Sequence, residues 1–338
     1  MADIAKIVNS LGGMAQKQQL VARGAHDLEL TRAVRSGSVM RARQGWYTTL
    51  PEQDPRVLAV RVGGRLTGIS ALIAAGAWVR GRFPLHVSVH DNAARLRSPW
   101  NRFLRWDKAG TPAVVLHWDD PFVARRGTAT SVHLLDALLR VVLDERVETA
   151  VAALDWALST NRIDRIDFER LVMQLPAELR PINRIVDDRC GSIPESEARV
   201  ALLARGHSLR SQVPVAHTKQ IDLVVDEEVG LEVDGKEHHR DRFESDRAKD
   251  LDITLAGMHA IRPSAQMVFH DWQRVLAGIE IAIAARTGSP FGNSGPQPVN
   301  PVLKPGFPRR RRRRTPRVPE FPQQRARDAA APAPRGPG

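Results

Sequence analysis

The sequence has little cysteine and no long hydrophobic run, and each shortage excludes a class of protein. Cys190 is the one cysteine among 338 residues, which excludes an internal disulfide framework and a zinc site built from several cysteines. The longest nearly unbroken apolar run, Ile69 to Val79, spans eleven residues and is too short to cross a bilayer. The first residues also lack the charged and then apolar segments of a signal peptide. The hydrophobic fraction of 42% is enough for packed cores. Since the sequence shows neither a membrane span nor a signal peptide, we expect a cytoplasmic protein with no membrane association.

The positive charge lies mostly at the C-terminal end. Of a formal net charge of +12, +9 falls in residues 291–338, which leaves +3 for the preceding 290 residues. Eleven of the 23 prolines also follow residue 290, so we expect residues 287–338 to form a disordered basic tail. Candidate phosphate ligands for DNA are its six consecutive arginines, Arg309, Arg310, Arg311, Arg312, Arg313 and Arg314. A solvated tail without a dedicated ligand is the alternative.

Residues 1–50 are predicted to form a winged helix-turn-helix. Apolar spacing and glycine stops indicate three short helices, over 4–11, 16–22 and 25–36, and two strands follow within 39–48. The third helix of a winged helix enters the major groove of DNA. Candidate DNA ligands are therefore Arg32 and Arg35 of that helix, and Arg41 and Arg43 of the hairpin. A winged helix that binds only protein stays open as the alternative.

Residues 51–190 are predicted to form a mostly helical linker domain. The pattern indicates strands at 85–90 and 114–118, and helices at 56–61, 67–78, 131–142, 147–158 and 167–175. His86, His90 and His117 fall on separate strands, and no carboxylate follows them at the spacing of a metal site. We therefore expect these histidines to be ordinary packing or surface residues.

Residues 191–286 are predicted to form a compact unit of helix, three strands, helix and strand, so the chain as a whole is a multidomain α/β (α+β) protein. Asp222 interrupts the apolar strand 221–225, and Glu232 and Asp234 interrupt the strand 229–234. Positions 232 and 234 share one face of a strand because side chains alternate with a period of two. If Asp222 faces the same way, three carboxylates converge.

Converging carboxylates need a compensating charge. Two bare carboxylates about 4 Å apart repel by roughly 4 kcal/mol at an effective dielectric constant near 20. Oxygen ligands of this kind suit Mg²⁺ or Mn²⁺, and Lys236, His238 and His239 are candidates to activate water or to protonate a leaving oxygen. The alternative is a salt-bridged network of the three acids with Lys236 and Arg247.

Four segments of this unit resemble a bacterial domain-of-unknown-function family that is related to the very-short-patch-repair endonuclease, in the restriction-endonuclease-like PD-(D/E)XK superfamily. The segments are Ser192–Glu195, Ile221–Val224, Glu232–His239 and Phe243–Asp250. Residues 1–50 resemble, more weakly, the winged helix of abortive-infection type IV antitoxins. The whole layout resembles actinobacterial chains that join these two modules. The resemblance implies an αβββαβ nuclease core in residues 191–286.

The resemblance also implies roles for single positions. Asp222 would be the metal-bridging aspartate, and Glu232 would be the second carboxylate that ligates the metal. Glu195 would be the outer carboxylate that holds metal-bound water. His238 or His239 would stand near the scissile phosphate. In the usual superfamily motif a lysine follows the second acid by two residues, whereas here Asp234 has that place and the lysine is Lys236.

Two functions are therefore expected as competing hypotheses. The first is a Mg²⁺- or Mn²⁺-dependent DNA endonuclease that the winged helix targets, with a homodimer needed for simultaneous cleavage of both strands. The second is a non-catalytic DNA-binding regulator or antitoxin, with a cognate toxin as partner and the nuclease-like domain as scaffold. RNA as the substrate stays open, because no residue pattern identifies a reader of the 2′-hydroxyl.

Overall fold

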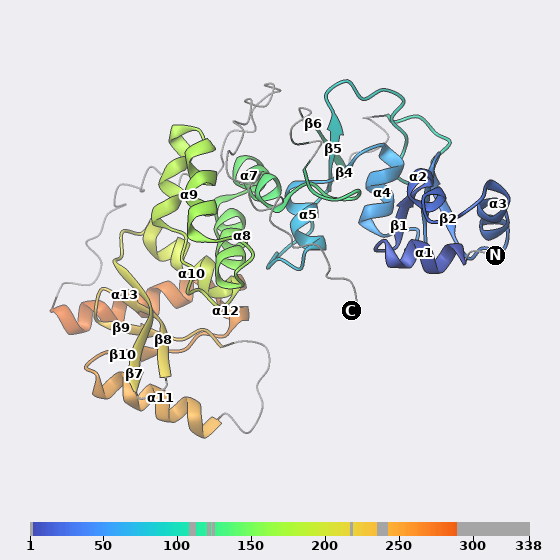
Figure 1. Ribbon diagram of the computed structural model, residues 1–338. Helices are drawn as coiled ribbons and strands as arrows, with labels where there is room; N and C mark the ends of the chain where they lie inside the picture. The colour runs from blue at the N-terminus through green and yellow to red at the C-terminus, as the bar shows by residue number, and fades with distance from the viewer. Residues whose placement is uncertain are drawn as a thin grey trace, which may run out of the picture.

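The structure is a computed structural model that describes residues 3–107, 113–119, 123, 126–216, 219–234 and 243–288. Figure 1 shows three groups of elements that follow one another along the chain, each with a small sheet. The fold is mixed α/β, as the sequence predicts. Among the described residues, no helix has the length and apolar character needed to cross a membrane.

The N-terminal group combines three short helices with a three-stranded antiparallel sheet of order β1-β3-β2. Its elements are α1 (Ile4–Ser10), β1 (Met14–Gln16), α2 (Lys17–Val21), α3 (Asp27–Arg35), β2 (Met40–Arg43) and β3 (Trp46–Thr48). The three helices and the hairpin are where the sequence predicts them. Strand β1 was not predicted, because three residues are too few to show a period. It exists because Met14 pairs with Thr48 and Gln16 with Trp46 across the sheet.

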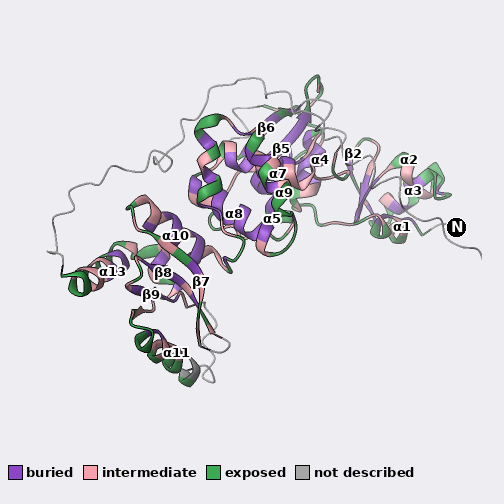
Figure 2. Cartoon of the chain, turned by 60° about the vertical axis from the view of Figure 1, so that its left-hand side comes forward, coloured by how far each residue is buried: buried purple, intermediate pink, exposed green. Residues whose placement is uncertain are grey.

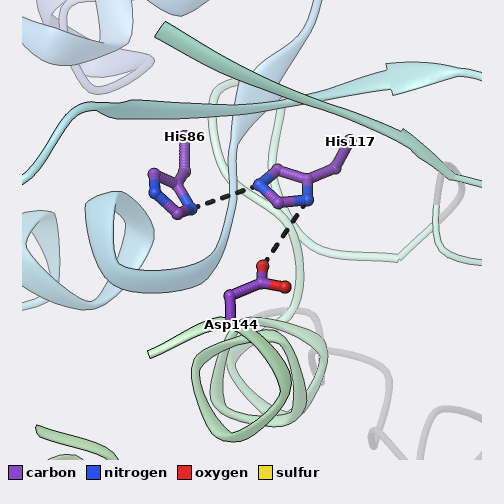
Figure 3. Close-up of side chains that lie close together, drawn as sticks. All are labelled: His86, His117 and Asp144. Carbon is purple, nitrogen blue, oxygen red and sulfur yellow. Dashed lines mark hydrogen bonds and ion pairs between the residues drawn. The ribbon is translucent and has the colours of Figure 1, made fainter. Parts of the chain in front are cut away.

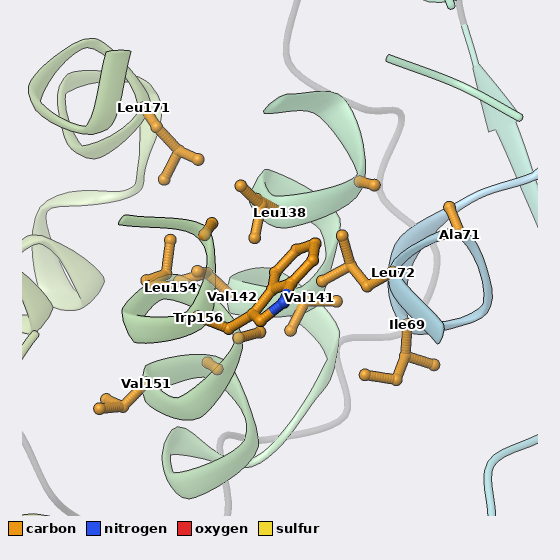
Figure 4. Packing of buried hydrophobic residues seen from close by; sticks show 14 of the residues in the cluster. Ile69, Ala71, Leu72, Leu138, Val141, Val142, Val151, Leu154, Trp156 and Leu171 are labelled. Atoms are coloured by element: carbon orange, nitrogen blue, oxygen red, sulfur yellow. The ribbon is translucent and has the colours of Figure 1, made fainter. Parts of the chain in front are cut away.

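The central group surrounds the largest hydrophobic core. Its elements are α4 (Pro55–Val62), β4 (Arg65–Leu66), α5 (Gly68–Ala74), β5 (Leu85–His90), β6 (Val114–Asp119), α7 (Leu134–Asp144), α8 (Val147–Ser159), α9 (Arg165–Gln174) and the 3₁₀ helix η1 (Ala177–Arg184). Figure 4 shows Trp156 of α8 between Leu138 and Val141 of α7 and Leu72 of α5. The sheet has the order β4-β5-β6, and β5 and β6 run parallel from Leu85 opposite Val114 to His90 opposite Asp119. This parallel pairing positions the histidines described below.

The C-terminal group begins with the predicted order of helix, three strands, helix and strand. The elements are α10 (Ile193–Ala204), β7 (Leu209–Ala216), β8 (Lys219–Val225), β9 (Val229–Leu231), α11 (Phe243–Leu255), β10 (His259–Ile261), α12 (Ala265–His270) and α13 (Trp272–Thr287). The sheet has the order β10-β9-β8-β7, and only its β9–β10 pair is parallel. The last two helices, α12 and α13, were not predicted.

Helices cover both faces of this sheet. Leu223 and Val225 of β8 pack in one cluster with residues of α10 and α13, whereas Val224 packs in another with Ile253 of α11. Figure 2 shows α11 mostly exposed, and the fully buried Ile253 is its main apolar contact with the strands. The acidic residues considered next lie at the start of α10, in β8 and just after β9.

Candidate functional site

Three carboxylates meet where α10, β8 and the end of β9 come together. Glu195 lies in the first turn of α10, and Ser192 caps that helix. The hydroxyl of Ser192 donates to Oε1 of Glu195 at 2.7 Å, and the backbone N–H of Gly191 donates to Oε2 at 2.9 Å. The cap therefore holds the Glu195 side chain, which is buried, in one orientation.

Asp222 and Glu232 interlock across neighbouring segments. The backbone N–H of Asp222 donates to Oε1 of Glu232 at 3.1 Å, and the backbone N–H of Val233 donates to Oδ2 of Asp222 at 2.9 Å. Glu232 is buried, and its other oxygen, Oε2, forms an ion pair with Nζ of Lys249 on α11. Each of these two carboxylates is thus fixed by the backbone of the other's segment.

Gln212 of β7 connects Glu195 of α10 with Asp222 of β8. Its side-chain amide nitrogen lies 3.4 Å from Oε2 of Glu195 and 3.4 Å from Oδ1 of Asp222. The backbone φ of Gln212 is +52°, in the left-handed region that a glutamine rarely adopts within a strand. Such an outlier in a strand suggests that the surroundings require this side-chain direction.

The electrostatics of the cluster are unfavourable for three ionised acids. Burial raises the pKa of Glu232 to about 7, and the negative charge of Asp222 adds to that shift, while Lys249 opposes it. Burial and then Asp222 also raise the pKa of Glu195. Buried like charges of this kind are typical of functional sites, where a proton, a basic side chain or a metal ion compensates them.

Asp234 makes its contacts elsewhere. Its Oδ1 pairs with Nη1 of Arg262 at 2.9 Å, and Arg262 also contacts Asp250 at 2.7 Å and Asp246 at 3.5 Å. The contacts of Asp234 are thus with Arg262, whereas Glu195, the outer carboxylate that the resemblance implies, is linked to Asp222 through Gln212. Arg262 draws Asp234 toward α11. Burial lowers the pKa of Arg262, but Asp250 and Asp234 together raise it above its ordinary value.

The sequence did not single out Gln212, Lys249 or Arg262. Lys249 lies within the segment that carries the family resemblance, but nothing in its local spacing relates it to Glu232, 17 residues earlier. The basic residues named for the salt-bridged alternative were Lys236 and Arg247. Lys236, His238 and His239 lie outside the described residues.

Helix α10 is anchored to the central group one turn beyond Glu195. Arg199 forms a buried ion pair with Asp155 of α8, and its Nε donates to the carbonyl of Ile185 at 2.9 Å. The hydroxyl of Ser196 also donates to Asp155, at 2.7 Å. The start of α10, and with it Glu195, is therefore held by the core of the neighbouring group.

The arginines that are predicted to contact DNA differ in how far they are buried. Arg32 and Arg35 are exposed on α3, and Arg41 is exposed on β2. Arg43 is half-buried, and its guanidinium donates to the carbonyls of Arg61 at 2.9 Å and Arg95 at 3.0 Å. Arg43 therefore ties the hairpin to α4 and the following region, and burial lowers its pKa. The arginines at 309–314 lie outside the described residues.

His86 of β5 and His117 of β6 are buried, as expected of packing residues, and they also face each other. Nδ1 of His86 lies 3.2 Å from Nε2 of His117, and Nδ1 of His117 lies 3.7 Å from Oδ2 of Asp144 (Figure 3). Nε2 of His86 lies 3.7 Å from Oε1 of Glu145. The sequence did not show this contact, because parallel pairing of β5 and β6 brings together residues 31 positions apart, and α7 then delivers the carboxylates. His90 remains a partly exposed surface residue, paired with Asp91.

Both buried histidines are poor bases. Burial lowers the pKa of His86 to about 4, and Arg140 adds to this effect. Burial lowers the pKa of His117 to about 2, with smaller contributions from Arg140 and His86. Both imidazoles are therefore neutral at pH 7, so each carries one N–H and one lone pair.

No protein-family model matches the chain, and no curated protein of known function matches it significantly. The case for a function therefore depends on the residues and their geometry.

Proposed function

We propose that the protein is a metal-dependent endonuclease of the PD-(D/E)XK type, related to the very-short-patch-repair endonuclease. The observation that carries the proposal is the acidic cluster of Glu195, Asp222 and Glu232. Gln212 links Glu195 to Asp222, and the backbone N–H of Asp222 donates to Glu232. The element order from α10 to β10 and the mixed sheet agree with the αβββαβ core that the resemblance implies.

The donor set suits a hard divalent cation. Carboxylate oxygens of Asp222 and Glu232 would hold Mg²⁺ or Mn²⁺, and Glu195 would orient a water beside it. When bound, such an ion supplies an activated water and stabilises negative charge on a phosphate. Lys249 faces Glu232 in the structure, so the ion and the ammonium group would share this carboxylate.

The remaining residues would position the substrate and the acids. Lys249, close to the acids, would stabilise negative charge on the phosphate oxygens as bonds are exchanged. Gln212 would keep Glu195 and Asp222 at a fixed separation through its amide group. His238 or His239 would act near the scissile phosphate, as the resemblance implies.

A winged helix would bring this site to DNA. The order α1, β1, α2, α3, β2, β3 and the antiparallel sheet β1-β3-β2 support that interpretation of residues 3–48. Arg32 and Arg35 on the exposed side of α3 would contact phosphates or base edges in the major groove. The arginines at 309–314 would add contacts with phosphates that are independent of sequence.

One observation favours the second candidate function, a DNA-binding regulator or antitoxin without catalysis. Glu232 already has a basic partner in Lys249, and Asp222 accepts the backbone N–H of Val233. These contacts would stabilise the acids without a metal, so that the nuclease-like domain would act as a scaffold. A cognate toxin or a second copy of the chain would then be the partner.

The deciding experiment is cleavage of supercoiled plasmid by the purified protein with Mg²⁺ or Mn²⁺, in parallel with a single-stranded RNA substrate. Under the nuclease proposal, nicking requires the metal and falls at least 100-fold in Glu232→Gln and Asp222→Asn. Glu227→Gln is the matched control, because Glu227 is an exposed acid in the turn between β8 and β9 that pairs with Arg210. Tight DNA binding without cleavage under either metal would instead support the regulator.

A further inference from the structure

The histidine pair in the central group has the geometry of a metal site separate from the acidic cluster. His86 and His117 come from paired parallel strands, and the two nitrogens that face each other are 3.2 Å apart. Two nitrogen ligands of a tetrahedral Zn²⁺ ion are separated by about 3.4 Å, since each Zn–N bond is about 2.1 Å long. The separation of these two nitrogens is thus close to that of two ligands of one ion.

We propose that His86, His117 and Asp144 bind a borderline transition-metal ion of the Zn²⁺ type. One ligand atom from each of these residues lies within 4.8 Å of the other two. Two imidazoles and a carboxylate are the ligands that Zn²⁺ takes in proteins, whereas Mg²⁺ prefers oxygen ligands alone. The site would therefore select a different metal from the acidic cluster.

The surroundings fit this role. Histidines that bind a metal usually donate their other N–H group to a carboxylate or carbonyl, which fixes the ring. Glu145 lies on that side of His86, with 3.7 Å between Oε1 and Nε2, so a small movement would bring it to hydrogen-bond distance. The side chain of Asp144 is 29% exposed, which leaves room for an ion to enter and for water as a further ligand.

One cation already lies nearby. Nη2 of Arg140 pairs with Asp119 at 3.1 Å, and its Nε lies 3.9 Å from Oδ2 of Asp144. Its closer partner is Asp119, so Asp144 keeps an oxygen for a metal. The positive charge would still weaken binding of a divalent ion, and the test must detect affinities in the micromolar range.

The site would join the sheet to the helices. His86 and His117 belong to the sheet, while Asp144 ends α7 and Glu145 follows it. A bound ion would therefore stabilise the folded central group, as any ligand that binds only the folded state does.

The test uses the full-length protein, freed of metal by EDTA and dialysis, and titrated with Zn²⁺ and with Co²⁺. We expect about one ion per chain, the strong visible absorption of four-coordinate Co²⁺, and a higher melting temperature with Zn²⁺. Asp144→Asn and His117→Asn should each weaken binding at least 10-fold. His90→Gln is the matched control, because His90 lies on the same strand as His86. Glu232→Gln excludes the acidic cluster as the binding site.

Loss of binding in Asp144→Asn, with binding kept in His90→Gln and Glu232→Gln, would support the site. If His117→Asn fails to fold, the partly exposed Asp144 variant decides. Absence of stoichiometric binding to the wild-type protein would overturn the proposal, and so would binding that survives both ligand variants. In either case the histidines would be a hydrogen-bonded pair of neutral rings.

Discussion

The side-chain amide of Gln212 lies 3.4 Å from the carboxylate of Asp222 on the neighbouring strand, and the backbone of Gln212 has a left-handed φ of +52°. We expect that backbone to be strained in any residue except glycine. Gln212→Gly should therefore be more stable than Gln212→Ala by about 1 kcal/mol, although both lack the amide. Urea unfolding of the two variants measures the difference. Equal stabilities would show that the strand relaxes and that φ at this position is not imposed by its surroundings.

The stability of the metal-free protein should depend on the protonation of Glu232. Its pKa is raised from 4.5 to about 7 in the folded state, so the folded protein holds the proton more tightly than the unfolded chain. This contribution is fully present below pH 4.5 and is lost as the pH rises through 7. Over that interval we expect the wild type to lose up to about 3 kcal/mol relative to Glu232→Gln, which cannot ionise.

The measurement is urea unfolding of both proteins with EDTA at several pH values between 4.5 and 7.5. Parallel pH profiles would contradict the prediction, because they would mean that Glu232 ionises without cost. Addition of Mg²⁺ at pH 7 should restore part of the lost stability only in the wild type, if the metal binds this carboxylate.

Some residues of the site could be predicted from the sequence and others could not, for physical reasons. Asp222 and Glu232 were visible in the sequence because ionisable residues interrupt apolar strands, where burial is costly. Gln212 and Lys249 were not, because their roles arise from a strand irregularity and from packing of a helix that is distant in sequence.

Long-range pairing also explains the other differences. Strand β1 forms only through its partner β3, and the histidine pair forms only through β5 and β6. Helices α7 and α8 were predicted nearly to their ends, since their apolar periodicity is local. Local patterns therefore give the elements, whereas the contacts that make a site depend on how distant segments meet.

The buried pair of Asp155 and Arg199 should be important for stability and for the position of Glu195. Removal of one partner leaves an uncompensated buried charge, so Asp155→Ala should lower the free energy of unfolding by about 3–5 kcal/mol. The double variant Asp155→Leu with Arg199→Met should lose less, because neither charge remains. Glu197→Gln, which breaks the more exposed pair with Arg80, is the control and should cost at most about 1 kcal/mol.

Chemical denaturation of the four proteins gives these values. If Asp155→Ala and Glu197→Gln cost the same, the link between α8 and α10 does not depend on this ion pair. A cleavage assay on the double variant would then report whether Glu195 keeps its place when α10 is held by apolar packing alone.

The N-terminal arginines should separate into one that holds the fold and others that bind DNA. Arg43 donates to the carbonyls of Arg61 and Arg95, so Arg43→Gln should lower stability by about 1–3 kcal/mol and leave DNA affinity nearly unchanged in the folded protein. Arg32→Gln and Arg35→Gln should instead weaken DNA binding at low salt, because both side chains are exposed on α3. Each lost phosphate contact should reduce the steepness of the plot of log affinity against log salt concentration by about 1.

Fluorescence anisotropy with a short duplex at several salt concentrations measures the slope, and thermal unfolding measures the stability. A salt slope that falls in Arg43→Gln but not in the α3 variants would place the DNA contact on the hairpin, and the third helix would no longer be the recognition element.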